Sequence, residues 1–199
     1  MLERFFPDEY ISSTYAIPFD RLYEEGYRGI IFDIDNTLVP HGAPADERAK
    51  QLFRDLKELG YSCCLLSNNQ ELRVKMFNEE IGVPYIFNAH KPAGKNYRRA
   101  MQLMGTDRNT TLFVGDQLFT DVWGAKRSGI HNILVRPIHP KEEIQIVRKR
   151  YLDKIRLHFY LKKKKKLGKK PAPGKLIGKP SLKIACRKFS GGGYNEKKM

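Results

Sequence analysis

Five short apolar runs rich in β-forming residues recur along the chain, and each of the first four is followed directly by polar residues. The runs span residues 29–34, 61–66, 85–87, 111–114 and 132–135. Segments with helical spacing of apolar residues span 46–59, 70–81, 94–104, 120–128 and 141 to about 160. Short strands that alternate with helices are typical of βαβ units. We therefore expect an α/β fold, a three-layer sandwich with a mainly parallel sheet.

The positive charge of the chain is concentrated at its C-terminal end. The 199 residues carry a formal net charge of +15. Residues 161–199 hold 14 Lys and Arg against one acid, Glu196, whereas residues 1–160 hold the other 23 basic and 21 acidic residues. The composition thus predicts three parts: an N-terminal arm over 1–25, a nearly neutral domain over 26–160, and a basic, disordered tail over 161–199.

Several classes of protein are unlike this composition. Three cysteines are too few for a disulfide framework, and no apolar run approaches the ~18 residues of a membrane span. The N-terminus has acids where a signal peptide has basic and apolar residues. We expect a cytoplasmic protein, or one that visits a membrane surface. The aromatic residues of the arm fit either packing against the domain or contact with a membrane.

The residues that follow the first four runs form a coherent chemical set. Asp33 and Asp35 lie at the end of the first run, Ser67 follows the second and Lys91 the third, while Asp116 and Asp121 follow the fourth. In an open parallel sheet the carboxyl ends of the strands meet at one edge, where ligands bind. Each residue alone is common by chance, but their order favours a functional site.

These residue types indicate phosphate chemistry. Several carboxylates at one rim need a hard cation such as Mg²⁺, which takes oxygen ligands. A Ser and a Lys beside that cation form a site for an oxyanion, most simply phosphate. An Asp there can act as a nucleophile, and a second Asp two residues on can transfer the proton.

The same segments resemble the haloacid dehalogenase (HAD) superfamily of aspartate-nucleophile phosphatases. FDIDNTL, LLSNN, HKP and VGDQLFTD match its four motifs in order, within roughly residues 1–160. With the opening MLERFFPDEY, they look like the YqeG-type branch of subclass IIIA, which is similar to phosphatidylglycerophosphate phosphatases. The resemblance implies a Rossmann-like sheet of the HAD type.

The resemblance also implies a role for each matching residue. Asp33 would be the nucleophile and Asp35 the general acid and base. Mg²⁺ would be held by Asp33, the main-chain carbonyl of Asp35 and Asp116, with Asp121 in a supporting role. The expected phosphate-binding residues are Thr37, Ser67, Asn68 and Lys91.

The short stretches between the motifs bear on the substrate. One helix, one strand and their turns fill each stretch, which leaves only residues 39–45 for a small flap. We expect no cap domain, and an open site suits a phosphate carried by a lipid headgroup, a nucleic-acid end or a protein side chain. The resemblance favours phosphatidylglycerophosphate, converted to phosphatidylglycerol. A phosphatase for nucleic-acid ends or phosphoproteins, and a non-catalytic RNA- or ribosome-binding module, stay open as alternatives.

The basic tail is compatible with more than one partner. Basic residues hold a protein on an anionic leaflet at roughly 1 kcal/mol each. They also bind nucleic acid through its phosphates, or simply keep a chain in solution. We expect a cytoplasmic protein that can sit peripherally at the inner face of a membrane, with its oligomeric state left open.

Overall fold

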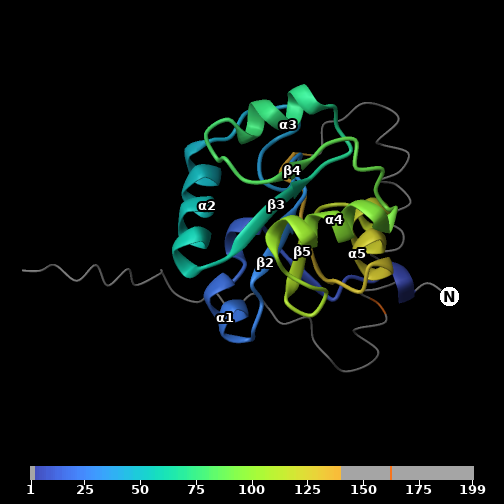
Figure 1. Ribbon diagram of the computed structural model, residues 1–199. Helices are drawn as coiled ribbons and strands as arrows, with labels where there is room; N and C mark the ends of the chain where they lie inside the picture. The colour runs from blue at the N-terminus through green and yellow to red at the C-terminus, as the bar shows by residue number, and fades with distance from the viewer. Residues whose placement is uncertain (1–2, 140–161, 163–199) are drawn as a thin grey trace, which may run out of the picture.

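A single sheet of six parallel strands forms the centre of the molecule (Figure 1). The computed structural model describes residues 3–139 and residue 162. The sheet order is β1-β6-β5-β2-β3-β4. The strands are β1 (Glu9–Ile11), β2 (Gly29–Phe32), β3 (Ser62–Leu66), β4 (Tyr85–Ile86), β5 (Thr111–Gly115) and β6 (His131–Val135). The predicted α/β sheet is confirmed, whereas the helix expected at 141–160 and most of the basic tail lie outside the described residues.

The central strand β2 explains why the site lies where it does. Its GIIF sequence is buried along its whole length, as expected for a strand covered on both faces. Gly29 is in register with Ser62 of β3 and with Thr111 of β5, so the three strands start together and run in the same direction. Their carboxyl ends therefore reach one edge of the sheet.

Helices cover both faces of the sheet and complete three layers. The core on one face contains residues of α1 (Phe19–Glu24), α2 (Glu47–Leu59) and α3 (Glu71–Asn78). The core on the other face contains residues of α4 (Gly94–Met104) and α5 (Trp123–Arg127), which lie next to each other in Figure 1. Apolar spacing places these side chains on the strands, as in the contact of Phe53 with Phe32, whose ring centroids are 5.3 Å apart.

Strand β1 is an element that the sequence pattern did not predict. Glu9, Tyr10 and Ile11 pair with Ile133, Leu134 and Val135 of β6 at the edge of the sheet. The Asp8 carboxylate accepts a hydrogen bond from the Asn132 main-chain amide at 3.1 Å, which fixes the start of the strand. Short 3₁₀ turns, η1 (Glu3–Phe5) and η2 (Thr14–Ala16), flank β1. Residues 9–11 of the arm are thus part of the sheet.

Two helices differ from their predicted bounds for local reasons. The helix expected over 70–81 ends at Asn78, because the Asn78 side chain bonds to both the amide and the carbonyl of Val83 and turns the chain. The segment expected as a helix over 120–128 begins earlier, as a π-helical turn, η3 (Leu118–Val122), which leads into α5.

The connections between β2 and β6 contain only these helices and their turns, so the described part of the chain has no cap domain. Nor does any helix in that part have the length and apolar character needed to span a bilayer.

Candidate active site

Asp33, Lys91 and Asp121 form a buried charged cluster at the carboxyl edge of the sheet. The Lys91 Nζ donates to Asp33 Oδ1 and to Asp121 Oδ1, each at 2.7 Å. Three different segments supply them: the end of β2, the loop after β4, and η3. The side chains of Lys91 and Asp121 are 3% and 1% exposed, so water contributes little to their solvation. The cluster thus joins residues from three of the four predicted motifs.

Burial and neighbouring charges raise the pKa values of both Asp33 and Lys91. Burial is the largest influence on Asp33 and raises its pKa to about 7, although the Lys91 ammonium acts in the opposite direction. Burial alone would lower the pKa of Lys91, but the carboxylates of Asp121 and Asp33 outweigh it and hold that pKa above its ordinary value. Lys91 therefore stays positively charged between two carboxyl groups.

Asp116 adds a third carboxylate that fits a metal ion. One carboxylate oxygen from each of Asp33, Asp116 and Asp121 lies within 4.8 Å of the others, and all three residues are buried. A set of oxygen donors at this spacing suits a hard cation such as Mg²⁺. Asp121 fits so close to β5 because Gly115 has no side chain: a Cβ there would lie 2.5 Å from Asp121 Oδ2.

Asp35 lies next to this cluster in sequence but contacts a different set of residues. Its Oδ1 accepts hydrogen bonds from Arg73 Nη2 at 2.8 Å and from the Gly42 amide at 2.8 Å. Its Oδ2 accepts a hydrogen bond from the Asn69 side-chain amide. The Nδ1 of His41 lies 3.9 Å from Asp35 Oδ1. Asp35 thus connects the start of α3 with the flap of residues 39–45.

The remaining predicted residues lie around these two groups. Ser67 is 1% exposed directly after β3, and its hydroxyl accepts a hydrogen bond from the Asn69 main-chain amide at 3.2 Å. The Thr37 hydroxyl is buried and has no hydrogen-bond partner among the described residues. Asn68 bonds to the main chain of Lys91, accepting from its amide at 2.7 Å, and so fixes the loop that carries the lysine. Phosphate binding by these residues stays a prediction.

Arg73, Asn69 and Gly42 are the site residues that sequence reasoning did not identify. Asn69 was visible in the LLSNN motif, directly after two residues that were identified. Arg73 carried no comparable signal, since it lies on a helix among other charged residues and is separated from Asp35 by 38 positions. Only the folded chain brings its guanidinium to Asp35.

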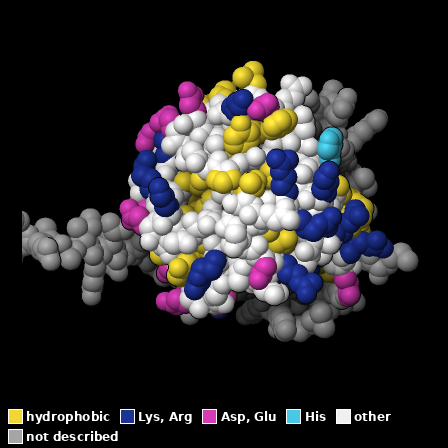
Figure 2. Space-filling view, in the orientation of Figure 1, with side chains coloured by type: hydrophobic (Ala, Val, Ile, Leu, Met, Phe, Trp, Pro, Cys, Tyr) yellow, Lys and Arg dark blue, Asp and Glu magenta, His cyan; other side chains and the backbone are white. Residues whose placement is uncertain are grey.

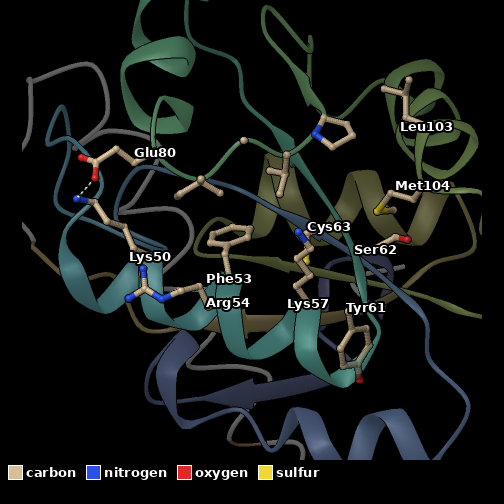
Figure 3. Close-up of a pocket in the computed structure, with 14 residues that line it drawn as sticks. Lys50, Phe53, Arg54, Lys57, Tyr61, Ser62, Cys63, Glu80, Leu103 and Met104 are labelled. Carbon is tan, nitrogen blue, oxygen red and sulfur yellow. Dashed lines mark ion pairs between the residues drawn. The ribbon is translucent and has the colours of Figure 1, made fainter.

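A separate cavity of about 430 Å³ lies away from the aspartate cluster, near the amino end of β3 (Figure 3). Apolar side chains such as Phe53 and Met104 line it, together with Lys57 and the Lys50–Glu80 ion pair. The cavity contains none of the predicted site residues. The predicted site residues therefore lie at the other end of the sheet.

Comparison with known proteins identifies the family. Residues 42–129 match the model of the haloacid dehalogenase-like hydrolases. The chain is 44% identical over 140 residues to "Probable phosphatase YqeG" of Bacillus subtilis (strain 168), a match that covers 69% of this chain and 81% of that protein. It is 30% identical over 173 residues to "Phosphatidylglycerophosphate phosphatase 1, chloroplastic/mitochondrial" of Arabidopsis thaliana, covering 81% of this chain and 48% of that protein.

Two solved structures also match part of the chain at low sequence identity. NagD from E. coli K-12 matches with a TM-score of 0.47 and 13% identity, covering 61% of this chain and 91% of that one. A HAD family hydrolase from Streptomyces avermitilis MA-4680 matches with a TM-score of 0.46 and 12% identity, covering 56% and 72%. By its sequence relatives and its motifs, the chain belongs to the haloacid dehalogenase-like hydrolase family and groups with the phosphatases of that family.

Proposed function

We propose that the protein is a Mg²⁺-dependent phosphomonoesterase that works through an aspartyl-phosphate intermediate. The observation that carries this proposal is the buried cluster of Asp33, Lys91, Asp116 and Asp121, with Asp35 two residues beyond Asp33. A cation between carboxylates at the end of parallel strands favours binding of an oxyanion there.

The proposed reaction has two steps. In the first, a carboxylate oxygen of Asp33 attacks phosphorus, the ester P–O bond breaks, and Asp35 gives its proton to the leaving oxygen. In the second, water attacks phosphorus and transfers a proton to Asp35, and the bond from phosphorus to Asp33 breaks to release phosphate. Lys91, Ser67, Thr37 and Asn68 are the proposed contacts of the phosphoryl oxygens.

The donor set supports a role for Mg²⁺ in this site. Asp33, the main-chain carbonyl of Asp35 and Asp116 would hold the ion, with Asp121 in support. Bound there, it would neutralise negative charge on the phosphoryl group and orient that group toward Asp33.

For the substrate we propose phosphatidylglycerophosphate, dephosphorylated to phosphatidylglycerol. The similarity to the Arabidopsis protein named phosphatidylglycerophosphate phosphatase 1 supports this choice of substrate. The surface agrees with an anionic partner, because Lys and Arg side chains gather over α4 and α5 in Figure 2. Helix α4 has three exposed basic residues, Lys95, Arg98 and Arg99, and no acidic residue. Such a face attracts anionic lipid.

Phosphate release from defined substrates tests this proposal. Wild type and Asp33→Asn would be compared, with Mg²⁺, on phosphatidylglycerophosphate in anionic vesicles, on phosphorylated nucleic-acid ends and on phosphopeptides. Release from the lipid by wild type alone is expected. Release only from nucleic acid or peptide would overturn the lipid substrate, and no release from any of the three would favour a binding module.

We also propose that the tail, residues 161–199, helps to hold the protein on an anionic membrane. Deleting it should weaken sedimentation with phosphatidylglycerol vesicles and leave RNA binding unchanged. The reverse pattern would instead favour a nucleic-acid partner.

A further inference from the structure

The carboxylate of Asp35 is held on both oxygens by residues distant from it in the chain. Arg73 reaches Oδ1 with two nitrogens, Nη2 at 2.8 Å and Nε at 3.3 Å. The Gly42 main-chain amide donates to the same oxygen at 2.8 Å, and the Asn69 side-chain amide donates to Oδ2. With donors on both oxygens, the plane and direction of this carboxyl group are fixed.

Arg73 is itself largely enclosed, which makes its contact with Asp35 strong. The side chains of Arg73 and Asp35 are 14% and 10% exposed. The third guanidinium nitrogen, Nη1, is buried and forms no hydrogen bond with the described residues. Burying an arginine costs free energy unless hydrogen-bond partners compensate it, and here the guanidinium donates to Asp35 Oδ1.

The position of Arg73 in α3 ties this contact to the rest of the site. Helix α3 begins at Glu71, and the short turn that joins it to β3 contains Ser67 and Asn69. The guanidinium carbon of Arg73 also lies 5.9 Å from the centroid of the Phe77 ring, which is fully buried in the core. The packing of helix α3 therefore determines where Arg73 holds the Asp35 carboxyl group, which lies beside the proposed nucleophile.

We propose that Arg73 is a positioning residue for proton transfer by Asp35. Because Arg73 and Gly42 donate to Oδ1, the proton of the Asp35 carboxyl group sits on Oδ2, and the two-nitrogen contact of Arg73 keeps Oδ2 aimed at the oxygen that leaves from phosphorus. This inference rests on the proposed phosphatase function and adds a residue to it. A misplacement of a reacting group by about 1 Å can slow a reaction on the order of 10²-fold, so the contact is expected to matter for the rate.

Substrates with different leaving groups separate this role from a merely structural one. An alkyl alcohol such as phosphatidylglycerol is a poor leaving group and needs a proton as the P–O bond breaks. The para-nitrophenolate ion is stable and leaves without one. The value of kcat/KM reports only the steps up to transfer of the phosphoryl group to the enzyme. It therefore isolates the first step, in which Asp35 acts as an acid.

The experiment measures kcat/KM of the full chain with Mg²⁺ on both kinds of substrate. The alkyl phosphate is phosphatidylglycerophosphate in mixed micelles or, should wild type not accept it, a phosphoserine peptide. The aryl phosphate is para-nitrophenyl phosphate. The variants are Arg73→Met and Arg73→Lys, with Asp35→Asn as a reference. The matched control is Arg54→Met, which changes an exposed arginine of α2 that bonds to Gln51.

The expected result is a selective loss. Arg73→Met should lower kcat/KM on the alkyl phosphate on the order of 10²-fold and should lower it far less on the aryl phosphate, the same selectivity as is expected for Asp35→Asn. Arg73→Lys should fall between, because lysine keeps the charge but not the forked contact, and it carries the test if Arg73→Met does not fold.

Equal losses on both substrates, or no loss on either, would overturn the inference while leaving the phosphatase function intact. A wild type that hydrolyses neither substrate would overturn the proposed function, and the inference with it.

Discussion

Lys91 is the residue on which the charge balance of the site depends. It is the cation between Asp33 and Asp121, and all three side chains are nearly or fully enclosed. If this lysine were exposed to solvent, water could replace its carboxylate partners at little cost in free energy. At this depth, its removal leaves two carboxyl groups without a counter-charge.

Replacing Lys91 by Met should therefore destabilise the protein strongly. Breaking a buried ion pair by removing one partner costs about 3–5 kcal/mol, so the free energy of unfolding should fall by about that amount. Urea unfolding without added metal measures the change. As a control, Lys75→Met removes the exposed pair with Glu71 and should cost no more than about 1 kcal/mol. Similar losses in both variants would contradict the buried cluster.

The two adjacent cysteines of β3 should be inert in the folded protein. Burial raises the pKa of the Cys63 and Cys64 thiols to about 12, from the ordinary value of 9.0. Since the folded state holds these protons more tightly, the stability they contribute is present below about pH 9 and is lost as the pH rises toward 12.

Iodoacetamide at pH 8 should therefore alkylate these two thiols about a thousandfold more slowly in the native protein than in urea, because only the thiolate reacts. Mass spectrometry of the peptide that contains both residues measures the two rates. Equal rates would contradict their burial.

At the level of single residues, the sequence predicted the positions of those site residues that directly follow the strands. Asp33, Ser67, Lys91 and Asp116 could be expected at one edge because parallel strands end together. The partners of Asp35 could not, since Arg73 and Gly42 reach it only through the packing of α3 and the path of the flap.

At the scale of elements, the close approach of η3 to β5 sets the position of Asp121. Gly115→Ala would place a Cβ 2.5 Å from Asp121 Oδ2 and 2.7 Å from its Cγ, so the turn would have to move. We expect a loss of about 1–3 kcal/mol in the free energy of unfolding, together with reduced phosphatase activity. Thermal unfolding and phosphate release measure the two effects.

Gly94→Ala is the matched control, because a Cβ there would meet only the ends of the Ser128 and Arg98 side chains, at 3.2 and 3.3 Å. A Gly115→Ala protein as stable and active as the Gly94→Ala protein would contradict this packing.

Strand β1 allows a test of whether the N-terminal arm packs against the domain or only contacts a membrane. Asp8→Ala removes the acceptor of the buried Asn132 amide groups, whose loss should cost about 1–3 kcal/mol of stability. Urea unfolding checks the value. An arm that only touches a membrane would show no change in solution.

The sequence did not predict β1 because three residues, Glu9–Ile11, are too short for a pattern, and their pairing partners lie more than 120 positions away. The strands from β2 to β6 were predictable because helices recur between them.

At the scale of the whole molecule, charge is distributed unevenly between the two helical layers. The exposed basic residues of α4 have no acidic neighbours on their own helix, whereas α2 mixes both signs. Binding of an anionic bilayer should therefore depend on the α4 face.

Changing Lys95, Arg98 and Arg99 to Glu should weaken sedimentation with phosphatidylglycerol vesicles on the order of a hundredfold or more, at roughly 1 kcal/mol per residue. The matched control changes Arg21, Arg54 and Lys57, exposed residues of α1 and α2, by the same total charge. Equal losses in the two triple variants would show that net charge alone governs binding, contrary to this prediction.

Detection of a covalent intermediate on Asp33 is the most direct test of the proposed reaction. Wild type and Asp35→Asn, with Mg²⁺, would be mixed with para-nitrophenyl phosphate, quenched in acid, digested and examined by mass spectrometry. We expect one phosphoryl group on the peptide that contains Asp33, and more of it in Asp35→Asn, which lacks the base for the second step. Turnover by an Asp33→Asn protein, or a phosphoryl group on another residue, would contradict it.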